Sequence, residues 1–408
     1  MLRFLTAGES HGKSLVAILE GFPAGLPIDF DQITRDLRRR QGGYGRGRRM
    51  AIESDAAEIM SGVRRGRTTG APIALVISNR DWINWHYTMT IEAEPPPEAG
   101  GARRAAVVRP RPGHADLAGA LKYDHEDMRD VLERASARET AARVAVGAFT
   151  RQLLRHFDVE IVSHVTAIGD VMRDPEAVAT FERLRQLPDD SPLRCVDPAL
   201  EAQMITAIDR AREAGDTLGG TFEVVAHGLP PGLGSYVQWD RKLDGRLAQA
   251  MMCIPAIKAV GIGDGADAAR RPGSSVHDEI VSRPDSADGL AIARPTNRAG
   301  GLEGGVTNGE DVRVTGHMKP IATLMKPLRS VDLTTLAEAP ATIERSDVCA
   351  VPAAAAVGEA MVAFVLADAF IERFGGDSLA QMETHVRETA LRLRRRLSRP
   401  TIAARPER

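Results

Sequence analysis

The chain has 408 residues, enough to bury a sizeable core without disulfides or structural metals. Its 53 basic and 55 acidic side chains leave a formal net charge of -2, so no field of the whole protein attracts nucleic acid or an anionic membrane. Its three cysteines are far apart, and no basic and apolar leader follows Met1. Both features predict a protein of the reducing cytoplasm.

Strand-like and helix-like patterns are interspersed along the chain without strict alternation and without a repeat. Short or alternating apolar runs predict strands at residues 2–6, 14–21, 72–78, 159–168, 220–228 and 310–317. Helical patterns occupy residues 126–157, 200–214 and 242–252. This order favours an α+β fold over a doubly wound parallel sheet.

The apolar run at residues 350–370 is long enough to span a bilayer. It contains Glu359 and Asp368, each of which would cost about 2.5–3.5 kcal/mol at membrane depth. The run therefore predicts a buried helix of a protein without a membrane partner, begun by Pro352 and stopped by Gly375 and Gly376. The segment at residues 92–104 and the basic tail from residue 392 are too polar for a core.

The stretch TAGESHGKS, residues 6–14, matches two catalytic patterns at once. Gly8 to Gly12 has the spacing of a hydrolase nucleophile elbow, and residues 7–14 have that of a relaxed phosphate loop. The elbow requires several earlier strands, and the phosphate loop must open a helix, whereas a strand pattern follows here. An ordinary hairpin turn is the structural alternative. Ser10, His11 and Lys13 between the glycines keep the stretch as a candidate site.

The stretch RRRQGGYGRGRRM, residues 38–50, places six arginines in a glycine-rich segment. The stretch has three interpretations: a solvated basic loop, a nucleic-acid-binding segment or a clamp on a small polyanion. Nucleic-acid-binding segments of this kind usually recur and carry several aromatic residues, whereas this one has Tyr44 alone. Further cationic segments lie at residues 109–116, 133–140, 296–323 and 344–352. Their shared chemistry is the binding of a multiply charged anion, with proton transfer by His and Asp and no metal-ligand set. Arg134 and Arg138 would share a helical face, and could instead pair with Glu133 or Glu139.

Three long motifs carry a family resemblance: GESHGKSLVAILEGFP, ERASARETAARVAVGAF and RSDVCAVPAAAAVGEA. The chain resembles chorismate synthases from about Leu2 to about Gly376. The resemblance implies a lyase that makes chorismate from 5-enolpyruvylshikimate 3-phosphate by 1,4-elimination, the last step of the shikimate pathway, with reduced FMN lending an electron transiently. It also implies a homotetramer and a single-domain β-α-β sandwich over residues 1–376, in which antiparallel sheets flank a helical layer. A C-terminal helix and a basic, partly disordered tail would follow in residues 377–408.

The resemblance further implies roles for individual residues. His11 would protonate the departing phosphate, His114 would assist the protonation state of the flavin, and Asp347 would remove the C6 proton together with the flavin. The implied substrate contacts are Ser10, Arg40, Arg46, Arg49, Arg111 and Arg138. The implied FMN contacts are Arg134, Ala135, Ser136, Ala256, Gly304, Lys319, Pro320, Ile321, Ala322, Thr323, Arg345 and Ser346.

Some positions depart from the family pattern. Pro255 stands where many members have an amide side chain at a flavin contact, Arg65 stands where His is common, and residues 258–261 read Lys-Ala-Val-Gly. No separate reductase domain is apparent, so reduced flavin is expected from an external flavin reductase or from NADPH-derived reduction. An RNA-binding or anion-binding protein and a phosphate-loop nucleotidase remain as alternative hypotheses.

Overall fold

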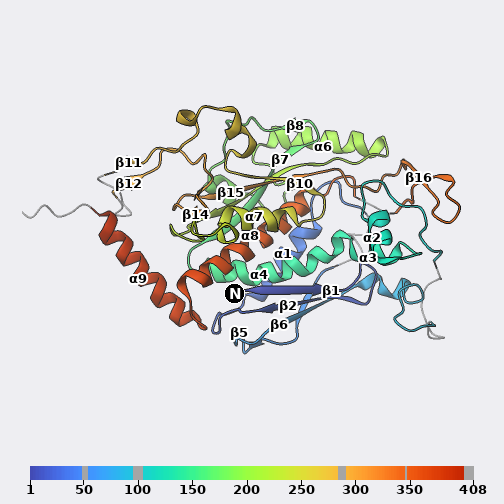
Figure 1. The fold of residues 1–408 in the computed structure, drawn as a ribbon, viewed down its shortest axis with the longest axis horizontal. Coiled ribbons are helices and arrows are strands. Elements are labelled where there is room, and N and C mark those ends of the chain that lie inside the picture. The colour runs from blue at the N-terminus through green and yellow to red at the C-terminus, as the bar shows by residue number, and fades with distance from the viewer. Residues whose placement is uncertain (48–53, 95–103, 284–290, 345–346, 399–408) are drawn as a thin grey trace, which may run out of the picture.

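Two antiparallel sheets, with helices between them, form the body of the molecule (Figure 1). The computed structural model describes residues 1–47, 54–94, 104–283, 291–344 and 347–398. The predicted α+β class with antiparallel sheets is confirmed. Most of the polar segment at residues 92–104 and the end of the basic tail lie outside the described residues.

The first sheet is built from the N-terminal hairpin and two later strands. Its order is β1 (Arg3–Ala7), β2 (Ser14–Glu20), β6 (Ile73–Ser78) and β3 (Ala57–Ile59), with antiparallel neighbours. Alternate residues such as Leu15, Leu19 and Leu75 are almost fully buried. This two-residue period gives the sheet one apolar face for the core.

The second sheet carries the longest strands. Its order is β10 (Ile257–Ile262), β15 (Val312–Met318), β9 (Gly220–His227), β7 (Glu160–Ile168) and β8 (Val171–Met172), again antiparallel. Phe222 and Val224 of β9 are fully buried on the core side. Between them along the strand, Glu223 is paired with His164 at 2.9 Å and with Arg313 at 3.0 Å. Burial would raise the pKa of Glu223, but these two partners lower it to about 2.

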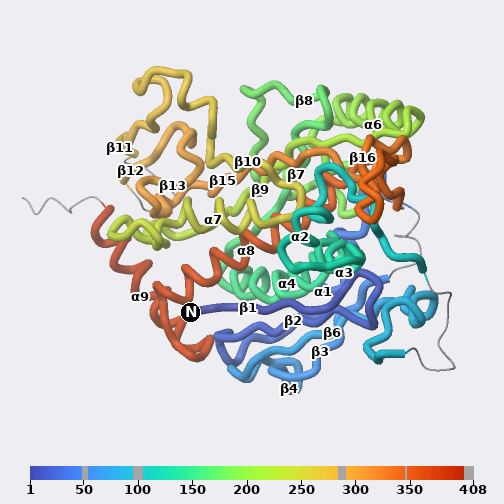
Figure 2. Tube along the Cα trace, turned by 45° about the vertical axis from the view of Figure 1, so that its right-hand side comes forward, coloured from blue at the N-terminus to red at the C-terminus, as the bar shows by residue number. Residues whose placement is uncertain are grey.

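Helices α1 (Phe30–Gln41), α4 (Thr140–His156) and α8 (Val351–Phe374) lie between the two sheets (Figure 2). Helix α4 contacts β2 and β6, α8 contacts β7 and β9, and the two helices pack on each other. Among the described residues, α8 alone is long and apolar enough to cross a membrane, and 83% of its apolar window is buried in the fold. The prediction of a buried core helix is confirmed, with Pro352 in its first turn and Gly375 at its C-terminal cap.

The remaining helices and two-stranded ribbons complete the fold. The remaining α-helices are α2 (Asp116–Tyr123), α3 (Arg129–Arg134), α5 (Phe181–Arg185), α6 (Pro198–Glu213), α7 (Leu243–Met252) and α9 (Leu379–Leu397). Two-stranded ribbons pair β4 (Val63–Arg64) with β5 (Arg67–Thr68), β11 (Val281–Ser282) with β12 (Ile292–Ala293), β13 (Leu302–Glu303) with β14 (Val306–Thr307), and β16 (Arg329–Val331) with β17 (Glu338–Pro340). Helix α6 begins at Pro198, slightly before the predicted helical pattern at residues 200–214, and the Asp197 side chain accepts hydrogen bonds from two backbone N–H groups of its first turn.

The continuous helix predicted over residues 126–157 is wrong. The structure divides it into α3, a single 3-10 turn at residues 137–139, and α4. Ser136 is extended, with φ -65° and ψ 143°, and its side chain caps the turn that follows. Arg134 is consequently exposed while Arg138 is buried, so the two arginines do not share one face.

The crossing of α4 and α8 leads to a stability prediction. A Cβ atom added at Gly147 of α4 would lie 2.3 Å from Cβ of Ala360 on α8. We expect Gly147→Ala to lower the free energy of unfolding by about 1–3 kcal/mol, because the overpacked helices must separate.

Gly245→Ala is the matched control, since Gly245 is also helical but has nothing within 4 Å of its Cβ position. That variant should gain about 0.5–1 kcal/mol. Urea denaturation measures both, and equal stabilities of the two variants would contradict the close approach of the helices.

Candidate active site

The loop between β1 and β2 carries the first group of candidate residues. TAGESHGKS is a hairpin connection followed by strand β2, so the phosphate-loop hypothesis is wrong. The side-chain amide of Asn79, at the end of β6, donates to the carbonyls of Glu9 at 3.1 Å and Gly12 at 2.7 Å. Gly8 has φ +103°, and a Cβ atom there would lie 2.3 Å from the carbonyl oxygen of Ser14. These contacts hold the loop in one conformation.

The Glu133 cluster consists of Ser10, His11, Glu133 and Ser136. The Glu133 carboxylate accepts from the backbone N–H of His11 at 2.8 Å and lies 2.9 Å from its Nδ1. Its side chain has 0% exposure, whereas that of His11 has 14%. The hydroxyls of Ser10 and Ser136 are 3.1 Å apart. Glu133 therefore sets the orientation of the imidazole and favours the tautomer with a proton on Nδ1.

An aromatic ring restrains the face of the same histidine. Trp85 stacks on His11 with 3.8 Å between ring centroids and 19° between planes. The guanidinium carbon of Arg104 lies 3.8 Å from the Trp85 ring centroid, a cation–π contact. The indole Nε1 donates to Asp81 at 3.0 Å. His11 is thus held at its edge by a carboxylate and at its face by an indole.

The Asp55 cluster consists of Arg40, Asp55, Asn79 and Arg138, all of which are buried. Asp55 accepts from Arg40 at 2.7 Å and from Arg138 through its other oxygen, and Arg138 Nε donates to the Asn79 side chain at 2.9 Å. Burial would raise the pKa of Asp55, but the two arginines lower it. Burial lowers the pKa of Arg40, and Asp55 offsets this only in part. Two buried cations share one carboxylate, which leaves the cluster suited to an anion.

One donor of this cluster lacks a protein acceptor. Nε of Arg40 is buried and has no hydrogen-bond partner among the described residues. A buried donor that makes no hydrogen bond costs about 1–3 kcal/mol. An anionic ligand that accepted this hydrogen bond would remove that cost.

The Asp116 cluster consists of Arg111, His114, Asp116 and Thr323. Arg111 donates to both oxygens of Asp116, at 2.8 Å and 3.0 Å, and to the Thr323 hydroxyl at 3.0 Å. Nδ1 of His114 lies 2.6 Å from Asp116. Burial would raise the pKa of Asp116, but the hydrogen bonds from His114 and Arg111 hold it well below the usual range. This cluster therefore contains an ionised carboxylate that orients a histidine.

Lys319 joins the Asp116 cluster to the second sheet. Its Nζ donates to the carbonyl of Gly113 at 2.9 Å, and its backbone N–H donates to the carbonyl of Ala256 at 2.9 Å. Burial and the neighbouring Lys258 lower the pKa of Lys319. Three of the residues predicted to contact a flavin, Ala256, Lys319 and Thr323, are thus connected with the catalytic candidate His114 through hydrogen bonds and the Gly113–His114 peptide link.

The fourth group, after the Glu133, Asp55 and Asp116 clusters, is the ion pair of Arg46 and Asp347. Arg46 Nη1 lies 2.6 Å from Asp347 Oδ2, and the backbone N–H of Gly47 donates to Oδ1 at 2.6 Å. Arg40 senses the positive charge of Arg46, which contributes to lowering its pKa. The predicted residues Arg49, Arg345 and Ser346 lie outside the described residues.

All four groups lie at one end of the molecule. The β1–β2 connection, α2, α3 and β16 gather there in both views, at the end opposite α9 (Figures 1 and 2). Asn79 joins two of the groups, because its side chain donates to the carbonyls of Glu9 and Gly12 in the loop that carries His11 and accepts from Arg138 of the Asp55 cluster. Gly304 lies elsewhere, in the turn between β13 and β14 and next to Tyr236.

Arg134, Ala135 and Ser136 follow one another at the end of α3. Arg134 donates to the carbonyl of Gly8 at 2.9 Å and that of Thr6 at 3.0 Å. The hydrogen bonds and ion pairs that the structure describes for Arg134 and Arg138 do not include Glu133 or Glu139. That alternative is therefore wrong. Their acceptors lie in the β1–β2 region and at Asp55 instead.

Sequence reasoning missed the carboxylates that organise these groups, and the tryptophan. Glu133 and Asp116 stand inside motifs that were singled out, ERASARET and RPRPGHAD, so their position beside a candidate Arg or His was an available signal. Asp55 and Trp85 had no such signal. They reach the site only through the pairing of β6 with β2 and β3 and the packing of α1.

The fold and these groups define an enzyme that binds a polyanion and holds oriented histidines and carboxylates beside it. The family model described as chorismate synthase matches residues 2–371. The chorismate synthase of Symbiobacterium thermophilum is 57% identical over 383 residues, covering 93% of this chain and 96% of that protein. That of Desulforudis audaxviator is 55% identical, covering 97% and 98%. A crystal structure of a chorismate synthase has a TM-score of 0.76 at 43% identity, covering 97% of this chain and 98% of that one.

The chain belongs to the chorismate synthase family. It is a lyase that converts 5-enolpyruvylshikimate 3-phosphate to chorismate, the final step of the shikimate pathway in aromatic amino acid biosynthesis. Members of this family use reduced FMN. The RNA-binding and nucleotidase hypotheses give way to this assignment.

The Glu133 cluster generates a kinetic prediction. Glu133→Gln keeps the shape of the side chain but removes the charge that orients His11. We expect kcat to fall about 100-fold with little change in KM, because an oriented acid contributes mainly in the transition state. Steady-state kinetics of chorismate formation measure this.

Glu139→Gln is the control, since this neighbouring carboxylate pairs with Arg143 at 2.7 Å. It should leave kcat close to that of the wild type. A Glu133→Gln variant whose kcat matches the control would show that Glu133 only supports the fold.

Proposed function

We propose that this chain eliminates phosphate and a C6 hydrogen from its substrate at the end of the molecule where the four groups lie, and that it depends on reduced FMN. The observation that carries the proposal is the convergence of buried arginines, two carboxylate-held histidines and Asp347 from distant parts of the chain. Each of these groups has a separate task in the elimination.

The buried arginines bind the substrate. A phosphate and two carboxylates must leave water, and charge-assisted hydrogen bonds of about 1.5–3 kcal/mol each compensate for that. Arg40 and Arg138 supply two fixed cations, with Nε of Arg40 as a donor that lacks a partner among the described residues. Arg46, Arg111 and Ser10 complete the proposed contacts, together with Arg49.

His11 acts on the leaving phosphate. With Nδ1 bonded to Glu133, Nε2 is the nitrogen that remains for the substrate. A proton delivered from Nε2 neutralises the charge that develops on the departing oxygen, and the arginines stabilise the rest. Stacking on Trp85 keeps the ring from rotating away during this step.

Asp347 receives the C6 proton. Arg46 and the Gly47 N–H occupy one lone pair on each of its oxygens, so the carboxylate is oriented and keeps lone pairs for a proton. The bond to Arg46 also ties the base to a proposed substrate-binding residue. Substrate binding and base positioning are therefore linked through one ion pair.

The residues around Lys319 fit a flavin phosphate and ring. Lys319 and the nearby Lys258 supply positive charge, and the Asp116 cluster presents His114. Reduced FMN, when bound, supplies an electron transiently and recovers it. The chain's own part is to hold that group with Ala256, residues 319–323 and Arg134 to Ser136, and to fix the protonation state beside it through His114.

We also propose the assembly and setting of the enzyme. Residues 1–376 form one β-α-β sandwich domain, and residues 377–408 add a helix and tail. The outer face of the first sheet exposes Leu5 at 73%, Ile18 at 43% and Met60 at 59%, which supports a homotetramer that covers it. An external flavin reductase, or reduction by NADPH, supplies the flavin in its reduced form. The buried helix α8 supports a cytoplasmic location.

Chorismate formation should require reduced FMN without net consumption of reductant. We expect turnover in an anaerobic assay with dithionite-reduced FMN and the phosphorylated substrate, and the flavin should be as reduced at the end as at the start. Equal turnover with oxidised FMN or with none would contradict this proposal.

The two proton-transfer residues should separate by isotope effect. Asp347→Asn slows C–H cleavage, so deuterium at C6 should give a larger isotope effect on kcat than in the wild type. His11→Ala should lower kcat by about 100- to 10,000-fold without that increase. His114→Ala should instead change the spectrum of the bound reduced flavin. Equal losses of affinity and rate in all three, with unchanged spectra and isotope effects, would make them structural residues.

A further inference from the structure

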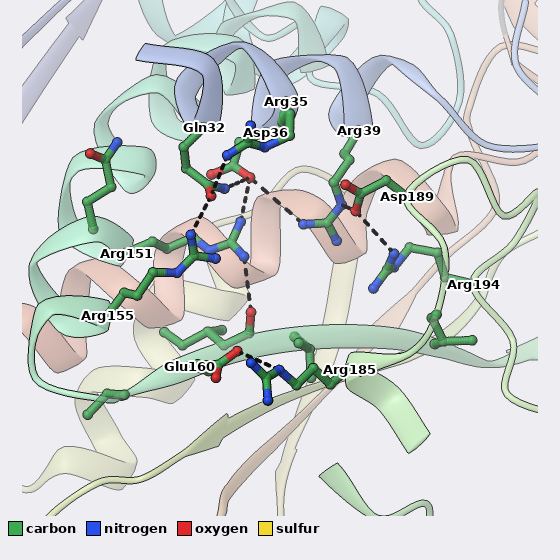
Figure 3. Close-up of a pocket in the computed structure, with 15 residues that line it drawn as sticks. Gln32, Arg35, Asp36, Arg39, Arg151, Arg155, Glu160, Arg185, Asp189 and Arg194 are labelled. Carbon is green, nitrogen blue, oxygen red and sulfur yellow. Dashed lines mark hydrogen bonds and ion pairs between the residues drawn. The ribbon is translucent and has the colours of Figure 1, made fainter. Parts of the chain in front are cut away.

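A second cluster of arginines surrounds a cavity of about 310 Å³ (Figure 3), which helix α1 separates from the Asp55 cluster of the active site. The two sites are separated by one position in the sequence: Arg40 faces Asp55, whereas Arg39 lines the cavity. Helices α1 and α4, the start of β7 and the segment at residues 185–194 form its walls. Its charged and amide residues are Gln32, Arg35, Asp36, Arg39, Arg151, Gln152, Arg155, Glu160, Arg185, Asp189 and Arg194.

The inner wall of the cavity is an ion-pair network that satisfies its own charges. Arg39 donates to both oxygens of Glu359, at 2.6 Å and 2.7 Å. Arg151 donates to Asp36 at 2.6 Å and lies 3.2 Å from Glu359. Burial would raise the pKa of Glu359, but Arg39 and Arg151 hold it well below the usual range. These ion pairs explain the positions of Arg39 and Arg151 without any ligand.

Two other arginines have only uncharged acceptors at hydrogen-bond distance among the described residues. Arg155 Nη1 donates to the Gln32 side chain at 2.9 Å. Arg194 donates to the carbonyls of Ser163 at 3.3 Å and Pro188 at 3.1 Å. Asp189 is 3.7 Å from Arg194 and its side chain is 63% exposed. Figure 3 shows the side chains of Arg155 and Arg194 extending toward the space between the walls.

By formal charge, the arginines of the cavity outnumber the carboxylates. Burial lowers the pKa of Arg194, and the like charge of Arg39 lowers it further. Six arginines line the space. Three carboxylates line the same space, and Asp29 and Glu359 pair with lining arginines from outside the cavity. Five carboxylates therefore face the six arginines.

We propose that this cavity is a binding site for a small polyanion, one that carries phosphate or carboxylate groups with a total charge of two or more. Its volume is that of a site for a small metabolite. The anion bridges Arg155 on α4 and Arg194 on the segment that follows α5, and Arg39 lies between them. It supplies a charged acceptor at hydrogen-bond distance, which both guanidinium groups lack among the described residues, and guanidinium is the side-chain group best matched to such oxyanions.

The test is anion binding by the full-length protein, measured by thermal stabilisation and calorimetry at constant ionic strength with chloride as the balancing ion. The probes are inorganic phosphate and citrate. Because the active site also binds anions, the decisive comparison is between variants. Arg155→Gln should weaken binding of the tighter probe about ten-fold or more, the loss expected for one charge-assisted bond.

Arg38→Gln is the matched control, an exposed arginine in the same turn of α1 as Arg39 that does not line the cavity. It should bind as the wild type does, and Arg155→Lys should retain part of the affinity. Tighter binding of phosphate would assign a phosphorylated ligand, and tighter binding of citrate a polycarboxylate. Equal affinity in Arg155→Gln and the control, or no saturable binding by the wild type, would overturn the proposal.

Discussion

The close packing of α4 on α8 is the constraint on which the rest of the structure depends. Gly147 and Ala360 allow the two helices to approach at their middle, and each helix covers a different sheet. Their N-termini point to the same end of the molecule, where α4 follows Arg138 and α8 follows Asp347. The distance between the proposed phosphate-binding residues and the proposed base is therefore set by the helical core rather than by the loops.

Buried carboxylates give this end of the molecule its order. Asp55, Asp116 and Glu133 each hold a cationic or histidine side chain in a fixed position before any ligand arrives. The cost of bringing several positive charges together is met during folding, so little reorganisation is left for the reaction itself. The arrangement also explains how Arg40 and Arg46 keep fixed positions in or beside a glycine-rich segment. Arg40 and Arg46 are tied to Asp55 and Asp347.

Helix α1 separates two clusters of arginines that have different partners. On one side Arg40 meets a single carboxylate that it shares with Arg138, and on the other Arg39 meets Glu359 of α8. These contacts also explain a feature of the sequence: Glu359 places a carboxylate in the middle of an apolar helix. It remains ionised in the core because two arginines and the hydroxyl of Ser163 surround it.

The sequence by itself determined the alternating strands and the buried helix predicted from the apolar run at residues 350–370, because each depends on local periodicity or on breakers, and it offered a hairpin at TAGESHGKS as one alternative. It also determined the family, through motifs that are long and widely spread. Only the tertiary structure decided which residues meet. Asp55, Asn79 and Trp85 reach the site through strand pairing, and helix 126–157 is divided at Ser136, where the chain turns Arg138 into the core. Contacts across 59 to 301 positions, such as Arg138 with Asn79 and Arg46 with Asp347, depend on sheet and helix packing, which a local pattern does not encode.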